Sequence, residues 1–288
     1  MRNQPGHGDV LSFYDFGRTT VQACAADPRF SYCAYVPESY DEHGTQVYRL
    51  LVAVHGTQRD NTGCRDAFID LAERHQVIVL APLFPGGMAA PRELSSYKRL
   101  RSSDGSGPAY DQVLLAMIEE ISAVYRIDAR RFLLYGFSGG AHFAHRFLYV
   151  HPERLEAVSI AAPGIVTVLD NQADWLAGVR NFEAVFGKPL DLEAMRRVAI
   201  HMVVGGDDSA TWEVALSSGH PWWQPAFDSH GATRIERMET LKASYLAQGI
   251  GVVHDVVPGV DHRQAPLLPA VKSFLSAAIT RLPVQDRC

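Results

Sequence analysis

The amino-acid sequence predicts an α/β protein with a mostly parallel central sheet, helices on both faces and lid-like excursions. Seven short apolar runs are rich in β-branched and aromatic residues, and most are continuous, as in strands covered on both faces. Helical patterns lie between most of these runs, and this alternation is typical of parallel sheets. The predicted strands are residues 31–37, 48–56, 77–82, 131–137, 156–163, 198–206 and 251–259.

The predicted helices are residues 66–76, 111–127, 141–151, 233–249 and 265–282. Three regions do not fit the alternation. Residues 83–108 are rich in Gly, Pro and Ser and are expected to form a long loop, and residues 163–197 and 209–232 hold all four tryptophans. Long excursions in compact domains usually carry function. We therefore expect one domain over residues 1–288 with two lid-like insertions; the alternative is that the tryptophans only pack the excursions onto the body.

Composition excludes several classes of function. The chain has 288 residues with 27 Lys and Arg against 32 Asp and Glu, a net charge of −5. It therefore lacks the basic surface of a nucleic-acid-binding protein, and no run approaches the roughly 20 apolar residues of a membrane span. The N-terminus has no basic segment followed by an apolar run, so no secretory signal is expected.

The cysteines favour a reducing compartment. The four cysteines form no CxxC pair and no zinc-type spacing with histidine, which predicts reduced thiols and a cytoplasmic location. Cys24 and Cys33 are close in sequence and remain the one plausible disulfide pair. The four positions are Cys24, Cys33, Cys64 and Cys288.

The stretch GFSGG, residues 136–140, follows a predicted strand and opens a predicted helix. In this context G-x-S-x-G indicates a nucleophile elbow, a sharp turn that lifts the serine hydroxyl above the sheet. Positions two before and two after the serine leave no room for a β-carbon, so glycine fits there. The helix N-terminus also directs its free N–H groups toward charge that develops near Ser138.

A serine needs a base within hydrogen-bond reach and a group that orients the base. In this architecture the partners follow in the order serine, acid, histidine. His262 lies just past the last predicted strand, whereas His254 lies inside it; His142 and His145, on the helix after the serine, are expected to pack that helix.

The candidate acids are Asp207 and Asp208, directly after a predicted strand. Gly205 and Gly206 let the chain turn out of the sheet there. The alternative for such a pair is a turn or a helix cap. The order of Ser138, this pair and His262 favours the catalytic interpretation.

An oxyanion hole needs two N–H donors. The backbone N–H of Gly139 follows the nucleophile, and the loop after the strand LLVAVHG supplies Thr57, with Gln58 in reserve. His55 comes too early in the chain to be the base and is expected to brace this loop.

At this point the sequence resembles the α/β-hydrolases, and is similar to their polyhydroxybutyrate depolymerase and feruloyl-esterase-like branch. The matching stretches are YVPESY, LLVAVHGTQ, DLAERHQVIVLAP, DQVLLAMIEEISAVYRIDARRFLLYGFSGGAHFAHRF, HPERLEAVSIAAPG, VVGGDD and PGVDH. The resemblance implies the α/β-hydrolase fold. It also implies an acid three residues after the glycine that ends the strand, which selects Asp208 and leaves Asp207 to cap the following turn. The depolymerases usually have a cysteine after the HG dipeptide, where this chain has Thr57.

The predicted function is a serine hydrolase of the carboxylesterase type, acting on a small ester without metal or organic cofactor. Ser138 would attack, His262 would move the proton, Asp208 would orient the imidazole, and Thr57 and Gly139 would bind the oxyanion.

Alternatives are an acyltransferase, a peptidase that anchors its substrate on Arg99 or Arg101, or a non-catalytic binding protein.

The active-site mouth is expected to be bordered by Trp212, Trp222 and Trp223. These aromatic side chains would favour an apolar or aromatic acyl group.

Overall fold

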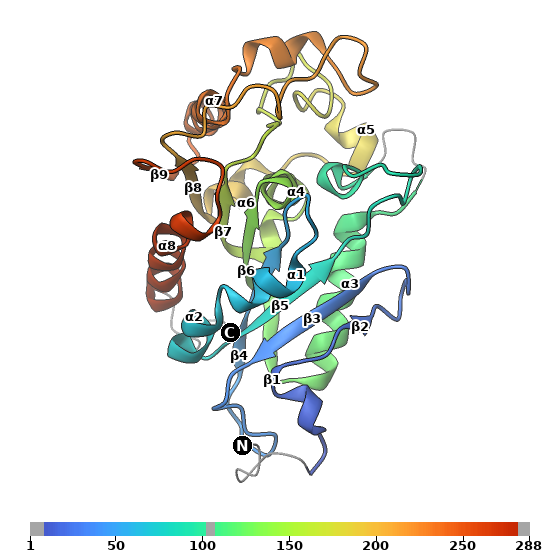
Figure 1. The fold of residues 1–288 in the computed structure, drawn as a ribbon, viewed down its shortest axis with the longest axis vertical. Helices are drawn as coiled ribbons and strands as arrows, with labels where there is room; N and C mark the ends of the chain where they lie inside the picture. Colours follow the sequence, from blue (N-terminus) through green and yellow to red (C-terminus); the bar gives the residue numbers. More distant parts are fainter. Residues whose placement is uncertain (1–8, 102–106, 282–288) are drawn as a thin grey trace.

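The computed structural model describes residues 9–101 and 107–281, and its centre is one sheet of nine strands (Figure 1). The strand order is β1-β3-β5-β4-β6-β7-β8-β9, with β2 also paired to β3. Strands β5, β4, β6, β7, β8 and β9 run parallel to one another, whereas β3 pairs antiparallel with β1, β2 and β5. The strands are β1 (Gly17–Arg18), β2 (Gln22–Ala23), β3 (Ser31–Val36), β4 (Tyr48–Val54), β5 (Val77–Leu83), β6 (Ile127–Phe137), β7 (Leu155–Ala161), β8 (Ala199–Gly205) and β9 (Val253–Val257).

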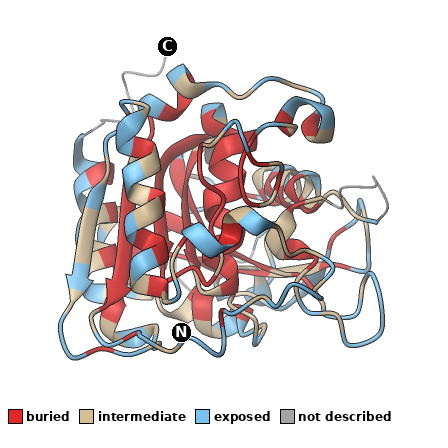
Figure 2. Cartoon of the chain, turned by 90° about the horizontal axis from the view of Figure 1, so that it is seen from above, coloured by how far each residue is buried: buried red, intermediate tan, exposed pale blue. Residues whose placement is uncertain are grey.

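All seven predicted strands are present, as β3 to β9, so the predicted fold class is confirmed. Every residue of β4 and β7 is buried, and helices lie on both sides of the buried strands (Figure 2). This burial on both faces explains why the runs are continuously apolar. The two short strands β1 and β2 were not predicted, because two residues carry no periodic pattern.

All five predicted helices have a counterpart in the structure. The predicted helix 66–76 begins only at Ile69, and a separate short helix over residues 61–66 precedes it. That short helix and two more in the first excursion were not predicted. The α-helices are α1 (Asn61–Asp66), α2 (Ile69–His75), α3 (Tyr110–Val124), α4 (Gly139–Val150), α5 (Phe182–Phe186), α6 (Leu192–Arg196), α7 (Arg234–Ala247) and α8 (Leu268–Arg281). The short 3₁₀ helices are η1 (Phe13–Asp15), η2 (Tyr97–Arg99), η3 (Pro152–Arg154), η4 (Pro225–Ser229) and η5 (Ala265–Leu267).

The two excursions leave the carboxyl ends of β7 and β8 and gather at the upper end of Figure 1. The first excursion does not stay there. Since β7 and β8 are parallel, the chain has to return to the opposite end of the sheet before β8 begins. Its last part, α6, accordingly packs against η3, which precedes β7. Only the earlier part of residues 163–197 can therefore cover the upper end.

Two further sequence expectations meet the structure here. Cys24, Cys33 and Cys64 are buried free thiols, so the Cys24–Cys33 pair does not form, and Cys288 lies outside the described residues. Among the described helices, none has the length and apolar character needed to cross a membrane.

Candidate active site

Ser138 occupies the turn between the last residue of β6 and the first residue of α4. Its backbone has φ 54° and ψ −114°, a left-handed conformation that side-chain-bearing residues rarely adopt. A β-carbon on Gly136 would lie 2.1 Å from the carbonyl oxygen of Gly140, and one on Gly140 would lie 2.2 Å from that of Val54. Both positions therefore accept only glycine, for the steric reason that the motif indicated.

Ser138, His262 and Asp208 form a continuous hydrogen-bonded chain. His262 Nε2 lies 2.9 Å from Ser138 Oγ, and His262 Nδ1 lies 2.7 Å from Asp208 Oδ2. Because a carboxylate can only accept, the Nδ1–H donates to Asp208, and Nε2 is left to accept the serine hydroxyl proton. The imidazole also stacks on Phe137, with 4.8 Å between ring centroids. The three side chains follow β6, β8 and β9; β8 and β9 are adjacent in the sheet, and β7 lies between β6 and β8.

The structure separates the two aspartates. Asp208 is 1% exposed and bonds to the imidazole, whereas Asp207 is exposed. Asp207 was expected to cap the following turn, and this expectation is wrong: within the described residues its carboxylate accepts no hydrogen bond, and only its backbone is engaged. The backbone N–H of Asp207 donates to the Val260 carbonyl at 2.9 Å, so the side chain faces solvent while the main chain joins two loops.

Arg234, the first residue of α7, holds the second oxygen of Asp208. Its Nη1 donates to Asp208 Oδ1 at 3.0 Å, and its Nη2 donates to Glu213 at 2.6 Å. The Arg234 side chain is 5% exposed, so the pair is shielded from solvent. The sequence analysis did not find Arg234, because 26 residues separate it from Asp208 and no local pattern marks the contact.

The predicted oxyanion donors lie beside the serine. Thr57 and Gly139 both line a pocket with Ser138, and in the described part of the chain neither backbone N–H has a protein acceptor. A β-carbon on Gly139 would lie 2.2 Å from Tyr97 Oη and 3.0 Å from Thr57 Oγ1, so these groups converge there. Tyr97 Oη donates to the carbonyl of His55 at 3.2 Å, which supports the loop from behind. Tyr97 lies in the region expected to be an unstructured loop and was not predicted.

His55 braces the same loop. Its Nδ1 bonds to the Gly56 carbonyl at 2.7 Å, and its Nε2 accepts from the Phe84 N–H at 3.0 Å. Burial lowers the pKa of His55 to about 4, so the ring is neutral at physiological pH. A neutral ring can donate at one nitrogen and accept at the other, as this loop requires.

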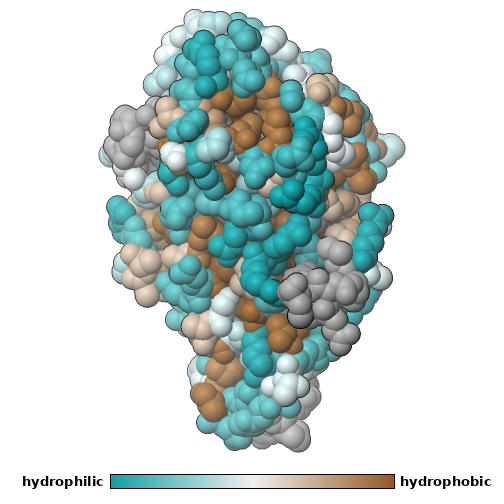
Figure 3. All heavy atoms as spheres, turned by 180° about the vertical axis from the view of Figure 1, so that it is seen from behind, coloured by the Kyte–Doolittle hydropathy of each residue, from teal (hydrophilic) through white to brown (hydrophobic). Residues whose placement is uncertain are grey.

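Two spaces meet at Ser138. The first, which we call the inner pocket, has a volume of about 300 Å³ and lies between α4, η2 and the excursions; Ile165, Leu176 and Trp222 form part of its wall. The second, the outer groove, measures about 970 Å³ and is lined by His262 and Trp212. Figure 3 shows the molecule from behind, with hydrophilic side chains over most of the face and apolar ones around a hollow near its upper end.

The three tryptophans predicted at the site lie in different places. Trp222 lines the inner pocket, and the 78% exposed Trp212 lines the outer groove. Trp223 lines a smaller neighbouring space of about 120 Å³ that Ser138 does not reach.

His142 and His145 fasten the first excursion to α4. His142 Nε2 accepts from the backbone N–H groups of Gly164 and Ile165, at 2.8 and 3.1 Å, and His145 Nε2 accepts from Thr167 at 3.1 Å. Burial lowers the pKa of both rings well below the ordinary value, which keeps them neutral and able to accept. The excursion that forms the wall of the inner pocket is therefore tied to the helix that begins at Ser138.

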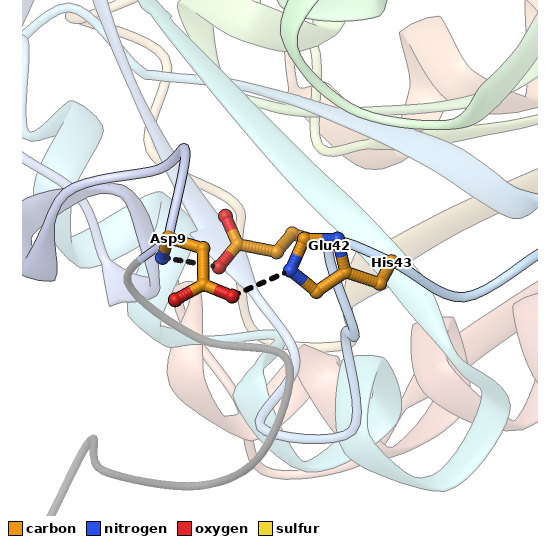
Figure 4. Close-up of side chains that lie close together, drawn as sticks. All are labelled: Asp9, Glu42 and His43. Carbon is orange, nitrogen blue, oxygen red and sulfur yellow. Dashed lines mark hydrogen bonds and ion pairs between the residues drawn. The ribbon is translucent and has the colours of Figure 1, made fainter.

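Asp9, Glu42 and His43 form a separate cluster of side chains (Figure 4). In the described residues it is the one group of acidic, histidine and cysteine side chains tight enough to hold a metal ion. Its contacts have a structural explanation. Glu42 accepts three backbone N–H groups from residues 9–11, and His43 Nε2 lies 2.8 Å from Asp9. The hydrogen bonds to Glu42 attach residues 9–11 to its loop, and they lower the pKa of Glu42 to about 2.

Comparison with solved structures gives the fold class. No family model matches the chain, and no curated protein matches its sequence. A poly(aspartic acid) hydrolase from Sphingomonas sp. KT-1 has a TM-score of 0.67 and 21% identity, covering 85% of this chain and 92% of its own. A poly(3-hydroxybutyrate) depolymerase from Bordetella parapertussis also has a TM-score of 0.67, with 22% identity and 88% of each chain covered.

An S-formylglutathione hydrolase from Agrobacterium tumefaciens has a TM-score of 0.60 and 18% identity, covering 93% of this chain and 97% of its own. The chain therefore has the α/β-hydrolase fold. Its similarity to the depolymerase is the relationship that the sequence motifs predicted.

Proposed function

We propose that the protein is a serine hydrolase that cleaves carboxylic esters through an acyl-enzyme. The observation that carries this proposal is the hydrogen-bonded chain from Ser138 Oγ through His262 to the buried Asp208. The fold is shared with esterases, but a fold alone does not define a reaction. The site has a nucleophile, a base and an orienting carboxylate, which are the parts that acyl transfer requires.

In the first half of the reaction, Ser138 Oγ attacks the ester carbonyl carbon while its proton passes to His262 Nε2. The carbonyl oxygen becomes an oxyanion that accepts hydrogen bonds from the N–H groups of Thr57 and Gly139. Asp208 stabilises the imidazolium through Nδ1. The carbon–oxygen bond to the alcohol then breaks, and the imidazolium gives its proton to the leaving oxygen.

In the second half, water takes the place of the alcohol. His262 accepts a proton from water, the resulting hydroxide attacks the acyl-enzyme, and the bond to Ser138 breaks as Oγ regains the proton. No step uses a cofactor. Arg234 keeps the Asp208 carboxylate oriented through both halves by occupying the oxygen that the imidazole does not use.

The proposal also covers the domain organisation, the role of the excursions and the cellular location. We propose that the chain works as one domain and that the early part of the first excursion, with residues 209–232, covers the site. The cytoplasmic location inferred from the sequence stays a prediction.

A fluorophosphonate probe tests the nucleophile. We expect the wild type to be labelled at Ser138 and the Ser138→Ala variant to be unlabelled, with a loss of about a millionfold in ester hydrolysis. A wild type that is folded and unlabelled would indicate a binding protein on a hydrolase scaffold. Transfer of the acyl group to an added alcohol or amine in preference to water would indicate an acyltransferase, and faster cleavage of the matching amide than of the ester would indicate a peptidase.

A further inference from the structure

The two spaces at Ser138 have different roles because of where His262 lies. His262 has to give its proton to the leaving group, and it lines the outer groove but not the inner pocket. The leaving group therefore departs along the outer groove, and the acyl group occupies the inner pocket. The side chains that line the inner pocket then decide which acyl groups the enzyme accepts.

Four cationic side chains line the inner pocket, against a single acidic one, Glu213. Two of the cations are already engaged. Arg234 is bonded to Asp208 and to Glu213. Arg99 stacks on Trp222, with its guanidinium carbon 3.3 Å from the ring centroid, and lies 3.7 Å from Glu93. The other two cations are Arg146 and Lys98.

Arg146 is a buried cation without a counterion. The residue is 2% exposed, its Nε donates to Thr167 Oγ1 at 2.9 Å, and its Nη1 donates to the Lys98 carbonyl at 2.6 Å. Both acceptors are neutral. Within residues 9–101 and 107–281 no carboxylate pairs with it, and Nη2 makes no hydrogen bond. Buried charges in proteins are normally paired, so an unpaired arginine in a pocket wall points to an anionic ligand.

Lys98 supplies a second unpaired charge next to the reacting atoms. A β-carbon on Gly139 would lie 3.0 Å from Lys98 Cε, which places the lysine side chain beside the oxyanion donor. In the part of the chain that the structure describes, its ammonium group makes no hydrogen bond or ion pair. Burial lowers the pKa of Lys98 to about 8, with the nearby positive charges of Arg59, Arg146 and Arg99 acting in the same direction and Glu93 opposing them.

We propose that the inner pocket binds acyl groups that end in a carboxylate, which pairs with Arg146 while Lys98 adds positive charge to the same pocket, so that the preferred substrates are half-esters of dicarboxylic acids. This inference rests on the proposed ester hydrolysis and narrows its substrate. It also replaces the expectation of an aromatic or purely apolar acyl group, because the face of Trp222 is covered by Arg99. Ile165, Leu176 and Val214 remain available for the methylene chain.

The position of Arg146 indicates the length of that chain. Arg146 is eight residues after Ser138 on α4, which is roughly 12 Å along the helix axis. Long side chains on a helix lean toward the helix N-terminus, which shortens this separation, and Arg146 lines the inner pocket together with Ser138. A dicarboxylic acyl chain of medium length, such as adipoyl, therefore suits the remaining gap better than a two-carbon unit. A carboxypeptidase would need a cation for the substrate carboxylate on the leaving-group side. Arg146 does not line the outer groove, so the structure does not favour that activity.

The test compares mono-4-nitrophenyl adipate with 4-nitrophenyl hexanoate, which differ only in the terminal carboxylate. We expect kcat/KM to favour adipate by at least about tenfold, since hydrogen bonds to charged groups contribute one to two powers of ten in affinity. The ratio should fall as pH rises through about 8, where Lys98 loses its proton.

Variants assign the effect to the two cations. Lys98→Met and Arg146→Met should each lower the adipate-to-hexanoate ratio by about tenfold. Lys272→Met is the matched control, because Lys272 on α8 pairs with Asp70 and lines neither space; its ratio should equal that of the wild type. Should Arg146→Met fail to fold, Lys98→Met decides, since the Lys98 ammonium has no described partner to lose.

Binding separates the two proposals. Adipate titrated into the Ser138→Ala protein should bind, and adipamide, its neutral analogue, should not. If the wild type cleaves both esters with a ratio near one, the anionic pocket is wrong and ester hydrolysis stands. If neither ester is cleaved but adipate binds in a manner that requires Lys98, ester hydrolysis is wrong and the anion site stands. Absence of both cleavage and binding overturns both.

Discussion

Ser138 holds a backbone conformation that costs a residue with a side chain about 1–3 kcal/mol, and its neighbours are fitted to that conformation. The motif in the sequence was enough to find this turn, because the residues that form it are consecutive in the chain. Asp208 and His262 were found from chain order and from their places after strands. Arg234, Arg146 and Lys98 were not, because their roles depend on contacts between segments that are distant in the sequence.

The two adjacent aspartates give the sharpest test at the residue scale. Asp208→Asn should lower kcat by about ten-thousandfold, because the amide no longer fixes the imidazole proton on Nδ1. Asp207→Asn should change kcat less than twofold and leave stability within about 0.5 kcal/mol, since its carboxylate is exposed and has no described partner. Steady-state kinetics on 4-nitrophenyl hexanoate measures both. Equal losses for the two variants would contradict the assignment.

The elements that carry the site are joined through their ends. Gly205, the last residue of β8, packs so closely on the loop after β9 that a β-carbon would lie 2.2 Å from the Val260 carbonyl. That contact brings the Asp208 and His262 loops together, and α7 then contributes Arg234 from its first position. Helix α7 was predicted at residues 233–249. Periodicity does not show, however, that the side chain of its first residue, Arg234, contacts Asp208 after β8.

A capping box fixes the start of α7 and with it the position of Arg234. Thr233 Oγ1 accepts from the Glu236 N–H at 3.2 Å, and Glu236 accepts from the Thr233 N–H at 3.3 Å. Thr233→Ala should therefore cost about 1 kcal/mol of stability in urea denaturation. Thr240→Ala, the same change inside the same helix, should leave stability within about 0.5 kcal/mol, because alanine is the better helix former. Equal effects at both positions would show that the cap contributes nothing.

At the scale of the whole molecule, the alternation of strands and helices predicted the sheet, because the central strands are buried on both faces and therefore form continuous apolar runs. The path of the first excursion was not predicted: residues 163–197 were expected to be lid-like throughout, but α6 returns to the far end of the sheet. The loop expected at residues 83–108 contains η2, whose Tyr97, Lys98 and Arg99 support or line the site. Such a segment has too few residues for periodicity and is ordered by tertiary contacts alone.

Buried histidines make the fold sensitive to mild acid. Burial is the main reason that the pKa values of seven described histidines are lowered: His55, His75, His142, His145, His201, His230 and His254. Of the histidines that the structure describes, only His43 and His151 have raised pKa values. Hydrogen bonds to Asp9 for His43, and to Asp111 and Glu153 for His151, outweigh burial. Below the ordinary histidine pKa of about 6.5, the unfolded chain binds more protons, so stability falls as pH falls.

The expected loss is about 1.4 kcal/mol per pH unit below 6.5 for each histidine that stays neutral in the folded state. His55, His142 and His145 have the pKa values that burial lowers furthest, so these three rings should dominate. Urea midpoints at pH 7.0 and 5.5 measure the effect, at a pH where the carboxylates are still ionised. A midpoint at pH 5.5 equal to or above that at pH 7.0 would contradict this account of the buried rings.

The central claim is that Ser138 forms a covalent acyl intermediate, and intact-protein mass spectrometry after rapid acid quench tests it most directly. During turnover of mono-4-nitrophenyl adipate or 4-nitrophenyl hexanoate, the account predicts a mass increase of one acyl group, located by peptide mapping on Ser138. The adduct should be absent from the Ser138→Ala protein. An acyl group on another residue, or hydrolysis by Ser138→Ala within tenfold of the wild type, would contradict the account.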